Sequence, residues 1–424
     1  MKIGSWKFRS QNLFITISLL LPILTAEAVE VPDYTLEQVV IFSRHGLRAP
    51  LATPSSTLGQ LTSHQWPLLD TKASYLTTKG GVLESYFGHY IQEWLVDNQL
   101  LDDKKCPTEK DIFFYANSMQ RTIATAQYLA LGAYPGCNVF VYHKEKMNTM
   151  DALFSLNIRD DSEQFKQQAI ASINQNAGEN GINGLNQRLQ SIYQKMEQII
   201  DYQGSVSCEG IEQCHLTNLD TNIRLVAGEE PGITGPLRIG TSLADAFILQ
   251  YYEGIPLKKI AWGNIDSVDE LKQLVSIKEY YNSIVFGAPV IANYVTKNLL
   301  SYIYDSFAES SVRPKVTVLV GHDSNIASLL SALQVKPYHL PNQFETTPIG
   351  GKLFFERWKD NQTGKQLMKI EYIYQSTEQI INMAILNRHN PPQVVTLQLT
   401  DCPTDQQGFC DYETFKTQLE RLIQ

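Results

Sequence analysis

The chain has 424 residues, of which 43% are hydrophobic and 19% are charged. This composition is typical of a globular protein with enough apolar material for two domains, or for one domain with a large insertion. Its 21 Tyr, 17 Phe and 5 Trp exclude a disordered chain, and its formal net charge of −9 argues against a nucleic-acid partner. A few arginines in a cleft can still bind an anion in an acidic protein.

The N-terminus has the three parts of a secretory signal peptide. The basic residues Lys2, Lys7 and Arg9 precede an apolar run at 13–24, and a small-x-small sequence ends at Ala28. The run is too short to span a bilayer, so residues 1–28 are interpreted as a cleaved signal peptide. The alternative is a fortuitous apolar tail on a cytosolic protein. Because no later stretch is apolar enough to span a membrane, we expect an exported, soluble product without a membrane partner.

Short β-branched and aromatic runs predict the strands of an α/β fold. In chain order they cover 39–42, 112–115, 139–142, 315–320, 352–358, 369–374 and 394–399. Helices are expected at 76–95, at 117–132 and at 325–333, and Thr77 or Thr78 can cap the first of them.

Helical patterns dominate the middle of the chain. They cover 162–174, 185–202, 242–252, 268–281 and 289–306. We interpret residues 150–310 as a mainly helical cap inserted into an α/β domain that consists of residues 29–149 and 311–424.

The six cysteines are even in number, as expected of an exported chain that forms disulfides. Pairing of sequence neighbours would close short loops, so we favour Cys106–Cys137, Cys208–Cys214 and Cys402–Cys410. Each bridge would contribute about 2–4 kcal/mol of stability. A metal site is the weaker alternative, because no two cysteines have C-x-x-C spacing.

Polar residues follow three of the predicted strands at the point where each strand ends. They are Arg44 and His45, then Asn117 and Arg121, and then His322 and Asp323. Ligands of α/β sheets bind outside the carboxyl ends of strands, so we expect these side chains to converge.

The segment RHGLRAP at 44–50 is the strongest chemical signal. Arg44 and Arg48 flank His45, and guanidinium groups bind oxyanions through paired donors, which suits a phosphate. Neutral histidine can act as a nucleophile, and neighbouring arginines favour its neutral form. Gly46 is expected to let the backbone approach a ligand. The alternative is a surface histidine among solvated charges.

His322-Asp323 supplies the second half of a phosphoryl-transfer site. Cleavage of a phosphate monoester needs a proton for the leaving oxygen, and an aspartic acid beside phosphate is expected to have a raised pKa. Alternatively, the dipeptide only caps the helix expected at 325–333. Arg121, about one turn into its expected helix, is a third candidate phosphate ligand, or else a surface arginine.

Together these features resemble the histidine acid phosphatase family, which has RHGxRxP near its start and HD late in the chain. The resemblance covers nearly the whole mature chain. It extends to LTTKGGVLESYFGHYIQEWL, YANSMQRTIATAQ, SLADAFILQYYEG and VLVGHDSNIASLLSAL, which are similar to the periplasmic branch that hydrolyses glucose 1-phosphate. The resemblance implies a mixed central sheet flanked by helices, with a helical cap, and a periplasmic location.

The resemblance also implies roles for the motif residues. His45 would accept the phosphoryl group and Asp323 would protonate the leaving group, without a metal or another cofactor. The phosphoryl oxygens would be held by Arg44, Arg48, Arg121 and His322. The substrate would be a small phosphate monoester, glucose 1-phosphate above all, with some activity on inositol phosphates.

Substrate choice is expected to depend on the loop at 229–236. By its match to the same branch, Glu230 would accept hydrogen bonds from sugar hydroxyls, and its charge would repel a highly phosphorylated ligand. The alternative is an exposed acidic turn. Gly46 departs from that branch, which has Asn there, and agrees with phytases, so a phytase of the same family is the alternative function.

Two further alternatives come from other functional classes. A sugar-phosphate binding protein would need the arginines but neither a nucleophile nor a proton donor. A mutase of the same superfamily would usually be cytosolic, which disagrees with the expected signal peptide and disulfides.

Overall fold

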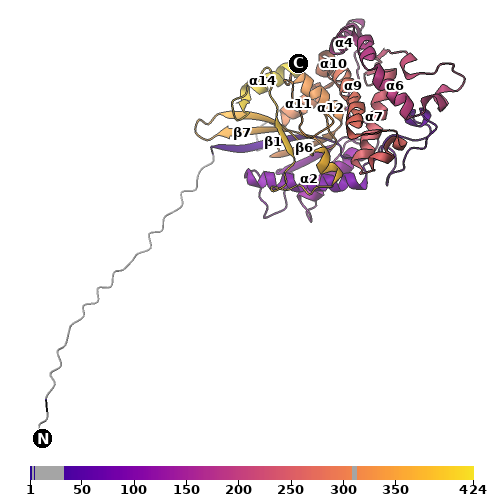
Figure 1. The fold of residues 1–424 in the computed structure, drawn as a ribbon. Helices are drawn as coiled ribbons and strands as arrows, with labels where there is room; N and C mark the ends of the chain where they lie inside the picture. The colour runs from indigo at the N-terminus through magenta and orange to yellow at the C-terminus, as the bar shows by residue number, and fades with distance from the viewer. Residues whose placement is uncertain (2–3, 5–32, 308–312) are drawn as a thin grey trace.

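The seven strands predicted from the apolar runs form one eight-stranded mixed sheet together with a short strand at Cys410–Asp411 that was not predicted (Figure 1). The computed structural model describes residues 1, 4, 33–307 and 313–424. The strand order is β10-β8-β7-β1-β6-β2-β3, and β9 pairs with β8. The strands are β1 (Tyr34–Arg44), β2 (Ile112–Ala116), β3 (Val141–Tyr142), β6 (Val316–Gly321), β7 (Lys352–Asp360), β8 (Gln366–Tyr374), β9 (Gln393–Thr396) and β10 (Cys410–Asp411).

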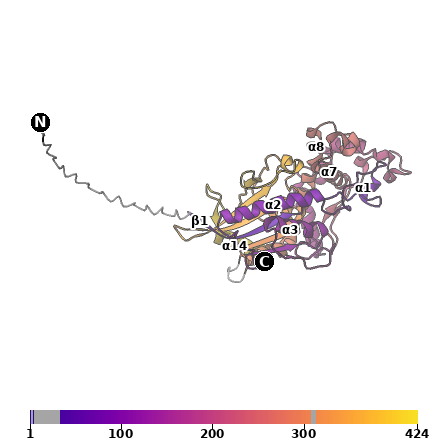
Figure 2. The same cartoon turned by 90° about the horizontal axis from the view of Figure 1, so that it is seen from below.

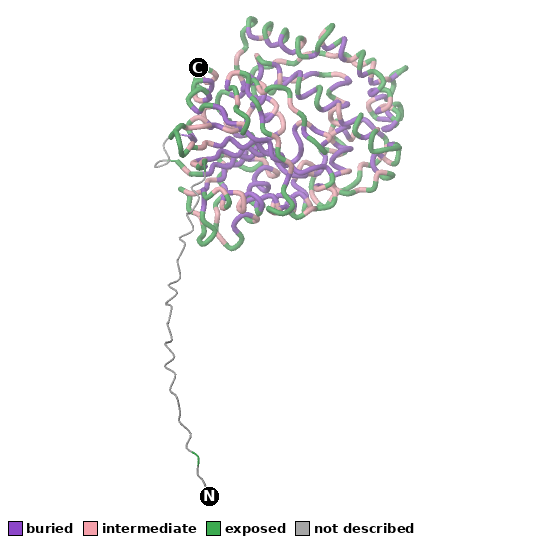
Figure 3. Tube along the Cα trace, turned by 60° about the vertical axis from the view of Figure 1, so that its left-hand side comes forward, coloured by how far each residue is buried: buried purple, intermediate pink, exposed green. Residues whose placement is uncertain are grey.

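The strands β1, β6, β2 and β3 are parallel, whereas β7 to β10 pair antiparallel. The middle of β1, Val39 to Phe42, is fully buried on both faces. Buried segments of the chain are concentrated in the interior of the molecule (Figure 3). A continuous apolar run is the pattern of a strand covered on both faces, which is why β1 lies at the centre of the sheet.

Helices cover both faces of the sheet. One face carries α2 (Thr78–Asp97) and α3 (Gln120–Ala133), seen from below in Figure 2. The other carries α11 (Lys297–Ser306), α12 (Asp323–Ala332) and α14 (Tyr412–Ile423). The hydroxyl of Thr77 accepts a hydrogen bond from the Gly80 amide at 3.0 Å, so Thr77 caps α2 as the sequence predicts.

The predicted helical region folds as a bundle beside the carboxyl ends of the parallel strands. Its helices are α4 (Glu163–Asn176), α5 (Gly181–Arg188), α6 (Gln190–Ile199), α7 (Pro236–Tyr252), α8 (Val268–Val275), α9 (Ile277–Val285) and α10 (Pro289–Val295). A hairpin of β4 (Ile223–Arg224) and β5 (Gly232–Ile233) lies among them, and short helices α1 (Thr57–Gln60) and α13 (Thr377–Ile381) lie outside this stretch of chain. Short 3₁₀ turns occur at Tyr202–Gly204, Val206–Cys208, Leu216–Asn218 and Leu257–Gly263.

The core of this region surrounds α7, in which Leu243 and Phe247 are fully buried. The helical region also contacts the helices that cover the sheet. Its helix α10 packs against α12, and α11 packs against α14, so packed helices join this region to the sheet. The exact limits of the cap, 150 and 310, stay a prediction.

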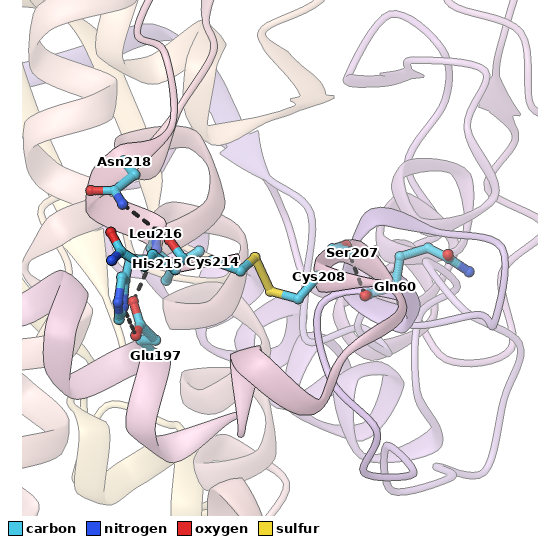
Figure 4. Close-up of a disulfide and its surroundings, with 9 residues drawn as sticks. Gln60, Glu197, Ser207, Cys208, Cys214, His215, Leu216 and Asn218 are labelled. Carbon is cyan, nitrogen blue, oxygen red and sulfur yellow. Dashed lines mark hydrogen bonds and ion pairs between the residues drawn. A yellow bond between two sulfur atoms is a disulfide. The ribbon is translucent and has the colours of Figure 1, made fainter. Parts of the chain in front are cut away.

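The three favoured disulfides are present. Cys106–Cys137, Cys208–Cys214 and Cys402–Cys410 are bonded, with Cα–Cα distances of 5.6, 5.6 and 5.7 Å. The second closes a short loop after α6, where Glu197 contacts His215 and the Leu216 amide (Figure 4).

The predicted signal peptide, residues 1–28, lies outside the described residues except for Met1 and Gly4. In the ranges that the structure describes, no helix combines the length and the apolar character needed to cross a membrane.

Candidate functional site

Three neighbouring parallel strands bring the predicted site residues together. Arg44 is the last residue of β1 and pairs in register with Gly321, the last residue of β6, so His45 and His322 follow side by side. Their ring centroids lie 5.6 Å apart. On the other side of β6, β2 ends at Ala116, immediately before Asn117. The expected convergence at the carboxyl ends of the strands is confirmed.

A cleft of about 540 Å³ opens above these strand ends, between the sheet and the helical region. Six of the seven predicted site residues line it: His45, Arg48, Arg121, Glu230, His322 and Asp323. The seventh, Arg44, lies buried beneath the cleft and contacts Asp323.

The His45 ring is held in one tautomer. Its Nδ1 lies 2.9 Å from the carbonyl oxygen of Gly46, which can only accept a hydrogen bond, so Nδ1 carries the proton and Nε2 keeps its lone pair. Burial lowers the pKa of His45 well below its usual value, and Arg121, Arg44 and Arg48 lower it further. The imidazole is therefore neutral even in mild acid, which is the form that can attack phosphorus.

The backbone around His45 is clamped from both neighbouring strands. The His45 amide donates to the Gly321 carbonyl at 3.0 Å, and the Gly350 amide donates to the His45 carbonyl at 3.1 Å. The Nζ of Lys352 then donates to the Gly350 carbonyl at 2.8 Å and pairs with Glu84 at 2.9 Å. This buried ion pair supports the loop from below.

The structure gives a different explanation for the glycine at position 46 from the approach to a ligand that the sequence suggested. A Cβ at this position would lie 2.8 Å from Cγ and 2.9 Å from Oε1 of Glu84, so the space beside Gly46 belongs to the Glu84 side chain. The Gly46 amide donates to the Thr125 hydroxyl at 2.8 Å. The glycine makes room for this packing beneath the loop, and Gly46 is not among the residues that line the cleft.

Arg44 is bound by carboxylates on two sides. Its NH2 lies 3.3 Å from Oδ2 of Asp323, and its NH1 lies 3.2 Å from Oε1 of Glu345 and also donates to the Thr347 carbonyl. Burial lowers the pKa of Arg44, but Asp323 and Glu345 outweigh burial and raise it above its usual value. Arg44 is thus a fixed positive charge beneath the cleft.

Asp323 lies at the first residue of α12, with about a quarter of its side chain exposed to the cleft. Burial alone would raise the pKa of Asp323, but Arg44 and Lys278 outweigh burial and hold the pKa below its usual range. The sequence predicted a raised pKa beside phosphate. These side chains supply the opposite shift, so a phosphate group must offset the arginine charge before Asp323 retains a proton.

The remaining arginines point into the cleft from different elements. Arg48 pairs with Asp245 of α7 at 2.7 Å, and Arg121 donates to the Ser74 hydroxyl at 3.0 Å. Arg121 is the second residue of α3, not one turn inside it, because the helix begins at Gln120. Burial and the charge of Arg48 lower the pKa of Arg121 to about 10, so Arg121 stays charged. Among the described residues Arg121 has no carboxylate within ion-pair distance.

His322 is oriented by Asn117. The side-chain oxygen Oδ1 of Asn117 accepts from the Asp151 backbone amide at 3.0 Å, which directs the side-chain Nδ2 of Asn117 to Nε2 of His322 at 2.7 Å. Nε2 therefore accepts, so in the neutral ring Nδ1 carries the proton. Nδ1 lies 3.4 Å from NH2 of Arg121, and since both groups are donors this contact is not a hydrogen bond. Burial, and then Arg121, lower the pKa of His322 well below its usual value, so it is a neutral hydrogen-bond donor.

Three charged residues of the site were not predicted from the sequence: the half-buried Asp245 on α7, and the buried Lys278 on α9 and Glu345 on the loop before β7. The Nζ of Lys278 lies 2.7 Å from Asp245 and 2.6 Å from Glu345. Together with the contacts above, they form one chain of alternating charges, Arg48–Asp245–Lys278–Glu345–Arg44–Asp323.

Glu230 lies on the wall of the cleft, between β4 and β5, and its neighbour Glu229 pairs with Arg224. Glu230 is an exposed residue of this wall; partial desolvation raises the pKa of its carboxyl, and Arg238 counteracts this effect. The guanidinium of Arg238 lies over the ring of Tyr281 at 5.3 Å. Glu230, Arg238 and Tyr281 thus line the part of the wall that lies beyond Arg48 and Arg121.

The geometry suits transfer of an oxyanion group to an imidazole. Fixed guanidinium groups surround a neutral histidine with an available Nε2, and a carboxyl group lies within the same cleft. Among the described residues, no group of three or more His, Cys, Asp or Glu side chains could hold a metal ion.

Comparisons with known proteins agree with this geometry. Residues 35–375 match the model of the histidine phosphatase superfamily, branch 2. The chain is 47% identical to a glucose-1-phosphatase of Salmonella typhimurium, over 90% of this chain and 91% of that protein. It is 41% identical to a glucose-1-phosphatase of Providencia rettgeri, over 99% and 100%. Among solved structures, the apo form of Hafnia alvei phytase matches with a TM-score of 0.83 and 29% identity, covering 93% of this chain and 98% of that one.

Proposed function

Because the chain belongs to branch 2 of the histidine phosphatase superfamily, we propose that it is an acid phosphomonoesterase that forms a phosphohistidine on His45 and needs no metal ion. The observation that carries this proposal is the neutral His45, with Nε2 available, among three arginines. A binding protein would need the arginines alone, and the buried, oriented nucleophile favours turnover.

In the first step, Nε2 of His45 attacks phosphorus and the bond from phosphorus to the leaving oxygen breaks. Asp323 donates its proton to that oxygen, which leaves as an alcohol. The phosphoryl oxygens are held by Arg44, Arg48, Arg121 and the Nδ1–H of His322. These groups are placed in advance, so they stabilise the charge of the transition state without reorganisation.

In the second step, water attacks the phosphohistidine. Asp323, now ionised, accepts a proton from the water as the oxygen binds phosphorus and the phosphorus–nitrogen bond breaks. Inorganic phosphate leaves, neutral His45 is restored, and Asp323 is protonated again for the next cycle. One carboxyl group thus acts first as an acid and then as a base.

The proposed substrate is glucose 1-phosphate, with related sugar phosphates. Support comes from two glucose-1-phosphatases at 47% and 41% identity and from Glu230 on the cleft wall, where a carboxylate can accept hydrogen bonds from sugar hydroxyls. Phytase activity is the second candidate, favoured by the fold shared with Hafnia alvei phytase. The proposed location is the periplasm, supported by three disulfides and the N-terminal sequence pattern.

The experiment is phosphate release at acidic pH with a chelator present, from glucose 1-phosphate and from phytate. His45→Ala is expected to lower kcat by at least about a thousandfold, since no nucleophile remains. The exposed His89 on α2 supplies the control His89→Ala, which is expected to behave as the wild type. Near wild-type turnover by His45→Ala would contradict the assignment of His45 as the nucleophile. No phosphate release from either ester by the wild type would favour the alternative of a sugar-phosphate binding protein. The ratio of kcat/KM for the two esters decides between the two substrates.

A further inference from the structure

Lys278 lies between the carboxylates that hold two arginines of the site. It comes from α9 in the helical region, and its side chain is almost fully buried, with 8% exposed. Its Nζ contacts Oδ1 of Asp245 at 2.7 Å and Oε1 of Glu345 at 2.6 Å. A single ammonium group therefore binds two acidic residues that come from different parts of the fold.

Each of these carboxylates also binds an arginine. Asp245 uses its other oxygen, Oδ2, to accept from Arg48 at 2.7 Å. Glu345 uses the same oxygen for Lys278 and for Arg44, the latter at 3.2 Å. The two arginines that bracket His45 in the sequence are thus linked through Asp245, Lys278 and Glu345, although Lys278 is more than 200 positions away in the chain.

The charges of the chain from Arg48 to Asp323 explain why a cation is needed between Asp245 and Glu345. In the free protein, where Asp323 is ionised, the carboxylates of Asp245, Glu345 and Asp323 balance the charges of Arg44, Arg48 and Arg121, so Lys278 supplies the excess positive charge that attracts a phosphate. Burial alone would raise the pKa of Asp245, but Arg48 and Lys278 outweigh burial and lower it well below its usual value, so this carboxyl stays ionised. The carboxyl groups of Asp245 and Glu345, both within 2.7 Å of one nitrogen, would lose their shared counter-charge if that nitrogen were removed.

We propose that Lys278 is a positioning residue for phosphate binding, which keeps Arg44 and Arg48 directed at the phosphoryl group by neutralising the two carboxylates that hold them. This inference rests on the proposed function. Without Lys278, Asp245 and Glu345 would draw their arginines more strongly and compete with the phosphate for the same guanidinium donors. Lys278 acts through these neighbours, and the phosphate is bound by the arginines.

The test is calorimetric titration of the full-length mature protein with inorganic phosphate at pH 5. Lys278→Met removes the charge and keeps an unbranched side chain, and it is expected to raise the Kd for phosphate at least about tenfold, which corresponds to about 1.4 kcal/mol. Lys278→Arg keeps the charge and is expected to recover most of the affinity. Lys195 is a matched control, because it also lies in the helical region and pairs with a carboxylate, Glu270, at 2.8 Å, but it does not line the cleft.

A role in structure alone would lower the melting temperature of Lys278→Met and leave the Kd unchanged, and that result overturns the inference. If Lys278→Met does not fold, Lys278→Gln takes its place under the same criterion. In the Lys278→Met background, Glu345→Gln is expected to recover part of the affinity by removing excess negative charge, and a further loss of affinity contradicts the electrostatic explanation. Wild-type protein that neither binds phosphate nor hydrolyses p-nitrophenyl phosphate overturns the proposed function itself.

Discussion

Arg44 and Asp323 form an ion pair across the ends of β1 and β6, with 3.3 Å between the guanidinium NH2 and the carboxylate Oδ2. A phosphoryl group that binds the same arginine must share it with Asp323. As the negative charge of the substrate offsets Arg44, the pKa of Asp323 should rise from its lowered value toward the range in which it holds a proton. Substrate binding and protonation of the proposed acid are therefore coupled through one guanidinium group.

Asp323→Asn is expected to affect esters according to their leaving group. Glucose leaves poorly without a proton, so kcat/KM for glucose 1-phosphate should fall at least about a hundredfold. Nitrophenolate leaves readily, and kcat/KM for p-nitrophenyl phosphate should fall less than about tenfold. Loss of the Asp323 charge affects Arg44 equally with both esters. The ratio of the two losses in kcat/KM therefore reports only the proton given to the leaving group. An equal loss on both esters would exclude Asp323 as the acid.

Glu230→Gln tests the contact with the sugar. We expect a rise of about tenfold in KM for glucose 1-phosphate, because a charged acceptor of hydroxyl hydrogen bonds becomes a neutral one. The KM for p-nitrophenyl phosphate should not change, since its ring offers no hydroxyl groups. Glu229→Gln is the matched control, because the adjacent Glu229 pairs with Arg224. If both variants have the same KM values as the wild type, Glu230 is only part of an acidic turn.

Glu356 is expected to make the protein more stable in acid than at neutral pH. It is buried on β7, where its Oε2 accepts from the Trp358 indole at 2.8 Å. Burial, and then the charge of Glu371, raise the pKa of Glu356 well above its usual value. A carboxyl with a raised pKa in the folded state stabilises folding below the pKa of the unfolded state, and this contribution is lost as pH rises toward the folded value.

Glu356→Gln imitates the protonated form, so its melting temperature should exceed that of the wild type by about 2–4 °C at pH 7 and equal it at pH 4. Thermal melts at both pH values test this, with the exposed Glu413→Gln as control. A lower melting temperature at pH 7 would show that Glu356 is ionised in the folded protein.

The disulfides should contribute unequally to stability. Cys106–Cys137 closes a loop of 31 residues, whereas Cys208–Cys214 closes one of 6. Loop-closure entropy then predicts a loss of about 4 kcal/mol for Cys106→Ser/Cys137→Ser and about 2 kcal/mol for Cys208→Ser/Cys214→Ser. Denaturant unfolding of the two double variants measures the difference. Equal losses would mean that native contacts, rather than loop length, set the contribution of each bridge.

The sequence predicted the parts of the site that are local in the chain. RHGLRAP at 44–50 and His322-Asp323 each follow a strand, and the parallel pairing of β1 with β6 places them together as expected. The three disulfides were also predicted, because each joins neighbouring cysteines. The helix α14 was not predicted, although Tyr412, Phe415 and Leu419 are spaced for one buried face.

The supporting charges could not be predicted in the same way. Asp245, Lys278 and Glu345 are far apart in the chain, and each is of a type that usually lies in solvent. Only the packing of α7 and α9 over the sheet brings them together, with Asp245 and Lys278 on the cleft wall and Glu345 buried behind it. The reason for Gly46 likewise depends on Glu84 of α2, which is a tertiary contact without a local signal.

The position of His45 at the end of the central strand has a consequence for inactivation by heat. Its amide and carbonyl are bonded to Gly321, the last residue of β6, and to Gly350, two residues before β7. Opening of this loop would therefore require separation of β1 from the middle of the sheet, which is the part of a domain that opens only with global unfolding. On heating, His45 should therefore lose its position, and the protein its activity, only when the whole molecule melts. Unfolding that is confined to the periphery should leave turnover unchanged.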